Sequence, residues 1–111
     1  ETRAPFQSQG VAGTVLNYYI EMYLCEGTEV YVMRCPDGQE DVEGMNGKVA
    51  AIRLSGGTAY RTPRGLTVGD TAYRAWLLYG KCAFTSSFYY QVEDGYVSTI
   101  VFHTRYWGSS F

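Results

Sequence analysis

The residues best suited to chemistry are one histidine and three cysteines. His103 and Cys82 could form a base and nucleophile pair, the arrangement that activates a thiol for covalent catalysis. A single histidine at the end of a predicted strand, beside Thr104 and Arg105, is much more typical of an exposed polar residue. We therefore expect no catalytic residues and no enzymatic activity.

The spacing of the cysteines argues against a metal or redox centre, because no pair shows the CxxC pattern. In the hairpin predicted below, Cys25 lies at the turn and Cys35 lies opposite Tyr18. About seven strand residues at roughly 3.3 Å each then separate the two thiols, which is far beyond disulfide reach. We expect buried free thiols, with a bridge from Cys82 to one of them as the alternative.

Two further motifs resemble ligand sites only in part. Glu40, Asp41 and Glu43 lack the regular spacing and the closing glutamate of a calcium loop, so we expect a solvated acidic loop. The glycines of RGLTVGD, residues 64–70, do not form the G-x-x-x-x-G-K-[ST] pattern of a phosphate-binding loop. We expect neither a metal ion nor any other cofactor.

Composition indicates one globular domain without a strongly charged partner. The chain has 111 residues, of which 46% are hydrophobic, and this suits a single core. Nine basic and eleven acidic residues leave a net charge of -2 without a long block of either sign, so nucleic acid is not an expected partner. No apolar run approaches the roughly 20 residues that cross a bilayer, and we expect no membrane span.

Alternating apolar residues predict a hairpin in the first half of the chain. Residues 15–24 show a period of two, which indicates a strand; a helix capped by Thr14 is the rival. A two-residue turn at 26–27 pairs this strand with residues 29–35 and places Tyr19 opposite Arg34. One face is then almost wholly apolar. The other, which we expect to be open to solvent, carries Tyr19, Glu21, Tyr23, Val30, Val32 and Arg34.

Residues 86–104 predict a second hairpin, for which two registers compete. With a two-residue turn at 94–95, Val92 would oppose Val97 and the apolar residues would be split between the two faces. With a three-residue turn at 93–95, the apolar residues stay together. We predict this second register, in which Val92, Tyr90 and Phe88 face Tyr96, Ser98 and Ile100.

The stretch TPRGLTVGDTAYRAWLLYG, residues 62–80, predicts one short helix. Asp70 or Thr71 caps its start and Gly80 stops it, while Gly69 takes the positive φ that a sharp entry requires. One side of this helix is expected to pack on the sheet, with most of the buried area supplied by the two aromatic rings. That side holds Ala72, Ala75, Trp76 and Tyr79.

An excess of aromatic residues, including 11 tyrosines, supplies the candidate binding residues. On the helix, Tyr73, Leu77 and Leu78 are expected to point away from the sheet. They would cover the N-terminal arm, or contact a second copy of the chain or a foreign protein partner. On the sheet, the candidates are Tyr19, Tyr23 and Arg34, which would suit a carbohydrate or another small ligand.

The expected fold is α+β: a single, mostly antiparallel sheet of about five strands with one short helix, about 70–79, packed on one face. Residues 1–111 are expected to form a single domain. Within it we expect a loose arm at 1–13, a first strand unit at 14–54, and the helix with a second strand unit at 58–106.

The order of motifs between Gly47 and Phe102 is R-G-L-x-V-G-D-T, helix, Y-G, a tyrosine-rich strand, D-G-x-V and a final strand. It resembles the small secreted or lipid-anchored α+β modules of Gram-positive bacteria. These modules share the helix-on-sheet plan of the β-lactamase-inhibitor protein and of small outer-membrane assembly lipoproteins. This chain departs from them in having no acylated N-terminal cysteine and no helix in its first half.

The resemblance implies an extracytoplasmic module, secreted or held in the cell envelope of a bacterium, that binds a partner and carries no catalytic residues. We therefore expect a non-enzymatic protein-interaction module. The alternative is a carbohydrate- or small-ligand-binding domain that uses an aromatic face of the sheet.

Overall fold

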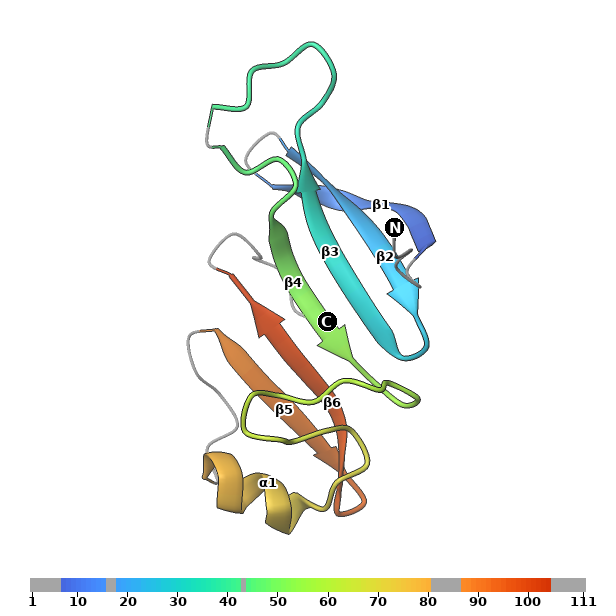
Figure 1. The fold of residues 1–111 in the computed structure, drawn as a ribbon, viewed down its shortest axis with the longest axis vertical. Helices are drawn as coiled ribbons and strands as arrows, with labels where there is room; N and C mark the ends of the chain where they lie inside the picture. The colour runs from blue at the N-terminus through green and yellow to red at the C-terminus, as the bar shows by residue number, and fades with distance from the viewer. Residues whose placement is uncertain (1–6, 16–17, 43, 81–86, 105–111) are drawn as a thin grey trace, which may run out of the picture.

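The computed structural model describes residues 7–15, 18–42, 44–80 and 87–104 (Figure 1). They form one open antiparallel sheet of six strands and one short helix, which confirms the α+β class. The elements are β1 (Gln7–Val15), β2 (Tyr18–Cys25), β3 (Thr28–Arg34), β4 (Val49–Leu54), α1 (Ala72–Tyr79), β5 (Phe88–Glu93) and β6 (Tyr96–His103). The strand order β1-β2-β3-β4-β6-β5 places β6 between β4 and β5.

Strand β1 corrects the expected loose arm at residues 1–13. From Gln7 to Val15 the chain pairs with β2, and this additional strand raises the sheet from about five strands to six. The pairing register shifts twice, on either side of Val11. Because such irregularities interrupt the alternation of the two strand faces, the sequence here lacks the period of two that identifies a strand.

Strands β2 and β3 form the predicted hairpin in the predicted register. Tyr19 lies opposite Arg34 and Ile20 lies opposite Met33, so the rival helix over these residues is wrong. The two-residue turn ends at Gly27, whose φ is 71°. A residue with a side chain adopts such a φ rarely, which makes glycine the suitable residue at this point.

The hairpin of β5 and β6 follows the two-residue register beside its turn and neither competing register beyond it, where Phe88 pairs with Phe102. Residues 94–95 have φ values of 53° and 83° and form a two-residue turn, so Val92 opposes Val97 and the predicted three-residue turn is wrong. A bulge at Ser98 then shifts the pairing by one residue. Because of this bulge, Val97 and Ile100 belong to the same buried cluster, and the apolar residues stay together without the longer turn.

Helix α1 begins and ends where the sequence predicts. The Thr71 hydroxyl accepts a hydrogen bond from the backbone N–H of Arg74 at 3.1 Å, which makes Thr71 the N-cap. Gly80, with a φ of 79°, ends the helix and donates its N–H to the carbonyl of Trp76 at 2.8 Å. Ala75 is fully buried, whereas Trp76, predicted on the same side, is 42% exposed. Tyr79, the other aromatic residue predicted on this side, packs against the Phe88 ring with 4.7 Å between the ring centroids.

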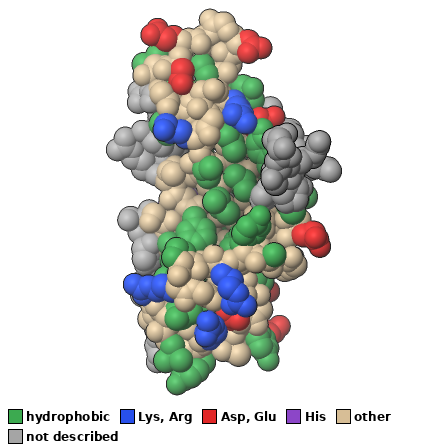
Figure 2. All heavy atoms as spheres, viewed as in Figure 1, with side chains coloured by type: hydrophobic (Ala, Val, Ile, Leu, Met, Phe, Trp, Pro, Cys, Tyr) green, Lys and Arg blue, Asp and Glu red, His purple; other side chains and the backbone are tan. Residues whose placement is uncertain are grey.

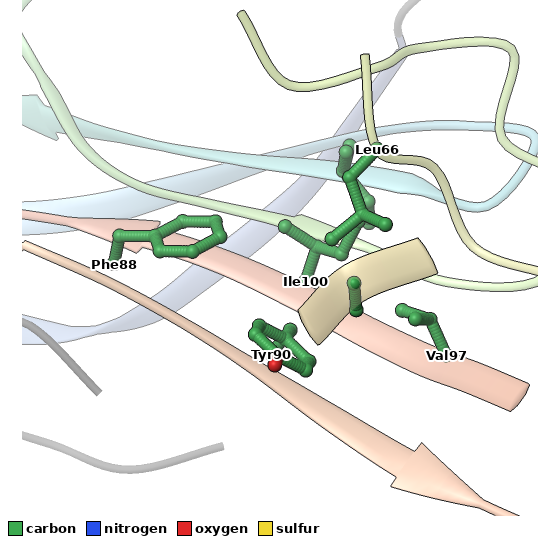
Figure 3. Packing of buried hydrophobic residues seen from close by; sticks show 7 residues of the cluster. Leu66, Phe88, Tyr90, Val97 and Ile100 are labelled. Atoms are coloured by element: carbon green, nitrogen blue, oxygen red, sulfur yellow. The ribbon is translucent and has the colours of Figure 1, made fainter. Parts of the chain in front are cut away.

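Two clusters of buried residues lie on opposite faces of the sheet. Tyr31 of one cluster pairs with Ala51, whereas Ile100 of the other pairs with Leu54, three residues further along β4 and therefore on the other face. The first cluster contains Leu54, Leu66, Ala75, Phe88, Tyr90, Val97 and Ile100, whose side chains gather between the sheet, the helix and the preceding loop (Figure 3). The second contains Tyr18, Ile20, Tyr31, Met33, Ala50 and Ala51.

Candidate binding site

The outer side of α1 presents large apolar side chains to solvent. Tyr73 is 66% exposed, Trp76 42% and Leu77 68%, and their spacing of three and four residues places them on one side of the helix. We call these three residues the helix stripe. Leu78, also expected to point outward, packs instead against the first buried cluster, because it follows Ala75 by three residues and shares its buried side.

The N-terminal residues that the structure describes do not cover the helix stripe. Strand β1 is at one edge of the sheet and β5 is at the other, while α1 lies beside the end of the molecule that holds β5 and β6 (Figure 1). Residues 7–13 of the expected arm at 1–13 therefore do not dock on the helix, and residues 1–6 lie outside the described residues.

The three sheet-face candidates lie together on β2 and β3, joined by a residue that the sequence prediction did not include among the site residues. Arg34 forms an ion pair with Glu21 at 2.9 Å and donates a hydrogen bond to the Tyr23 hydroxyl at 2.7 Å, and that hydroxyl donates to Glu21 at 2.8 Å. These bonds, the one to Tyr23 first, raise the pKa of Arg34 above its ordinary value. Tyr19 is the cross-strand partner of Arg34. The arginine is thus held beside the Tyr23 ring, 5.9 Å from its centroid.

The same face of the sheet contains an apolar cavity of about 260 Å³. Its floor is a row across three strands, in which Val30 pairs with Ile52 and Ile52 pairs with Phe102. We call this cavity the sheet-face cavity. Its lining is Thr28, Val30, Ile52, Leu54, Tyr60, Arg61 and Phe102. Hydrophobic side chains gather over the middle of the sheet, with Lys and Arg side chains toward both ends (Figure 2).

One wall of the sheet-face cavity is a loop that several hydrogen bonds attach to the sheet. The hydroxyls of Thr28 and Thr58 are 2.6 Å apart, and the Ser55 N–H donates to the carbonyl of Gly27 at 2.7 Å. Further along, the Thr67 hydroxyl donates to the carbonyl of Tyr60 at 2.8 Å. The sequence could not reveal this cavity, because it depends on the pairing of β4 with β6, which are separated by the helix and the loop.

The acidic loop between β3 and β4 is fastened to the sheet through one carboxylate. Asp41 accepts hydrogen bonds from the Tyr18 hydroxyl and from the N–H groups of Met45 (3.0 Å) and Asn46 (3.3 Å). The bond from Tyr18 is the main cause that lowers the pKa of Asp41. Among the described residues, no group of three or more His, Cys, Asp or Glu side chains is placed to hold a metal ion. Glu43 lies outside the described residues.

The remaining chemical candidates are not brought into one site. Cys25 and Cys35 are free thiols, as predicted, but both are half-buried rather than buried. Cys82 lies outside the described residues, so its pairing with His103 stays a hypothesis. The His103 ring lies 6.1 Å from the ring of Tyr89. In the described part of the chain, no helix is long and apolar enough to cross a membrane.

Comparisons of the chain with protein-family models, with curated proteins and with solved structures give no match. The candidate surfaces for function are therefore defined by the geometry of this chain alone. They are the helix stripe and the sheet-face cavity.

Proposed function

We propose that the protein is a non-enzymatic protein-interaction module whose contact surface is the helix stripe. The observation that supports this proposal is the exposure of three large apolar side chains, Tyr73, Trp76 and Leu77, on one side of a single helix. Burial of one such side chain against a partner stabilises by roughly 1.5 to 3 kcal/mol. Aromatic residues are also the side chains that most often dominate binding energy at protein interfaces.

We also propose that the module acts outside the cytoplasm, in a bacterial cell envelope or secreted from it. This part of the proposal is supported by the resemblance of residues 47–102 to small secreted modules. The partner on the helix stripe is a second copy of the chain or another protein. Fractionation of the source organism with an antibody against the folded chain tests the location.

A single substitution, Leu77→Glu, tests the contact surface. If the protein self-associates, we expect this change to convert it to a monomer in light scattering and to remove the concentration dependence of its melting temperature. If the partner is another protein, we expect it to abolish capture of that partner while the melting temperature of the chain alone stays unchanged. Val42→Glu is the matched control, since Val42 is 76% exposed on the loop between β3 and β4, away from α1. A wild-type chain that stays monomeric, and partners that bind both variants equally, would contradict the proposal.

A second candidate function, small-ligand or carbohydrate binding, is favoured by the sheet-face cavity. Its volume of about 260 Å³ is close to the lower limit of ordinary ligand sites. Tyr60, which is 46% exposed, supplies a ring at its wall. A thermal-shift panel of sugars and small organic molecules tests this function, because a ligand that binds only the folded state raises the melting temperature.

A further inference from the structure

The sheet-face cavity has an apolar floor. Of the seven described residues that line it, Arg61 alone is charged. Val30, Ile52 and Phe102 offer the floor no hydrogen-bonding side-chain group. The Thr28 hydroxyl is already bonded to that of Thr58 at 2.6 Å. The part of an occupant that contacts the lining of this half-open cavity therefore meets mainly hydrocarbon, with a guanidinium at one side.

The charge of Arg61 is only partly balanced by its neighbours. The Asp70 carboxylate lies 3.9 Å from Arg61 but 3.3 Å from Arg74, and it also accepts a hydrogen bond from the N–H of Thr67 at 2.9 Å. Two arginines thus share one carboxylate, which leaves one positive charge in excess beside the cavity. The Arg61 side chain is 57% exposed. Its Nη1 donates to the Gly65 carbonyl at 2.8 Å, and a guanidinium has five N–H donors in all.

We infer that the sheet-face cavity binds a small amphipathic carboxylate, with its apolar body on Val30, Ile52 and Phe102 and its carboxylate on Arg61. This inference deepens the second candidate function and rests on it. An apolar cavity of 150 Å³ accommodates benzene. The larger volume here, about 260 Å³, suits one ring or a short branched chain together with its polar head. A carboxylate matches the planar donor edge of a guanidinium better than any neutral head group does.

The test compares 3-phenylpropanoate with its neutral amide, 3-phenylpropanamide, on the folded chain. Methyl NMR of Val30 and Ile52 reports occupancy of the floor directly. We expect the carboxylate to shift both methyl signals and to bind about tenfold more tightly than the amide, which is the difference expected for one charged hydrogen-bonded contact. Added salt should lower the affinity for the carboxylate and leave the affinity for the amide unchanged.

The variant Arg61→Gln is expected to lower the affinity for the carboxylate about tenfold and to leave the affinity for the amide unchanged. Arg64→Gln is the matched control. Arg64 lies three residues further along the same loop, does not line the cavity, and donates instead to the Leu78 carbonyl at 2.6 Å. The variant Arg64→Gln removes the same charge from the same loop without changing the lining of the cavity. It should therefore change the affinity for the carboxylate less than twofold.

Four results overturn the inference. Equal binding of carboxylate and amide removes the role of the charge. If Arg61→Gln and Arg64→Gln weaken carboxylate binding equally, the effect comes from the overall positive charge of the loop and not from a contact with Arg61. Methyl shifts with a neutral sugar or with the amide alone refute the carboxylate class but leave small-ligand binding standing, whereas no shift with any probe refutes both. None of these results bears on the helix stripe.

Discussion

At the scale of single residues, Gly27 and Gly69 show two different reasons for a glycine. Both have positive φ, 71° and 98°. A Cβ at Gly27 would lie only 2.5 Å from the carbonyl oxygen of Gly56 and from the backbone nitrogen of Thr58, whereas a Cβ at Gly69 would meet nothing within 4 Å. Conformation alone requires glycine at position 69, while conformation and close backbone packing both require it at position 27.

Gly27→Ala should therefore destabilise more than Gly69→Ala. For Gly69→Ala we expect a loss of about 1 kcal/mol, the strain of a side chain at positive φ. For Gly27→Ala we expect a further loss on the order of 1 to 3 kcal/mol, because backbone atoms must move. Denaturant titration of the two variants measures the difference. Equal midpoints would show that the turn at 26–27 can move away from the loop at 55–58 without loss.

The bond between Tyr18 and Asp41 makes the stability depend on pH. The pKa of Asp41 in the folded protein is lower than the ordinary 3.8, so folding favours the ionised carboxylate. The stabilisation is present above about pH 4 and is lost as the pH falls through the lowered pKa. We expect the melting temperature of Asp41→Asn to fall less between pH 6 and pH 3 than that of the wild type. Asp37→Asn, which removes another carboxylate of this loop, is the control.

At the scale of elements, α1 is held by its N-cap, by the buried side chains of Ala72 and Ala75, and by Tyr79, which packs against the first cluster. The Thr71 hydroxyl satisfies the N–H of Arg74, while the Asp70 carboxylate serves the preceding turn by accepting from the N–H of Thr67. Thr71→Ala should lower the free energy of unfolding by about 0.5 to 2 kcal/mol. Thr71→Ser keeps the cap and should lie close to wild type in a denaturant titration. A Thr71→Ser variant as unstable as Thr71→Ala would contradict the role of the hydroxyl.

Trp76→Ala and Ile100→Ala contrast an exposed ring with a core side chain. Ile100 is fully buried, and its truncation should cost about 2 to 5 kcal/mol. Trp76 is 42% exposed, so its truncation should cost less than that of Ile100 although the ring is larger. Thermal melting of both variants in parallel checks the order. The reverse order would mean that the Trp76 ring is buried in solution, as it would be at an interface between copies.

The sequence predicts the parts of this fold that local patterns determine. The register of β2 and β3 follows from a two-residue turn, and the ends of α1 follow from Thr71 and Gly80. Strand β1 escapes prediction because its irregular pairing breaks the alternation. The sheet-face cavity escapes because Ile52 and Phe102 become neighbours only when β4 pairs with β6. Of the predicted site residues on the helix, Tyr73 and Leu77 are exposed, whereas Leu78, one residue after Leu77, packs against the first cluster.

At the scale of the whole molecule, one sheet separates two cores. The first cluster lies on one face and includes Leu66 and Ala75 from outside the sheet, and the second lies on the opposite face at the β2–β3 side. The molecule measures 49 × 31 × 22 Å, with the helix stripe near one end (Figure 1). Tyr73, Trp76 and Leu77 do not line the sheet-face cavity, so the stripe and the cavity are separate surfaces.

The strand order also sets an order of events in folding. Every pair of adjacent strands is adjacent along the chain except β4 and β6, where Leu54 meets Ile100 across nearly half the sequence. Closing so long a loop is entropically slow compared with forming a hairpin. We expect the two local units to form early and the pairing of β4 with β6 to limit the folding rate.

The conservative change Ile100→Val should destabilise the protein by about 1 kcal/mol. If the contacts of Ile100 are already formed in the transition state, stopped-flow refolding slows about fivefold while the unfolding rate hardly changes. Before β4 pairs with β6, a partly folded chain exposes the unpaired edges of both strands. This is therefore the stage of folding at which the protein is most prone to aggregate with other copies of itself.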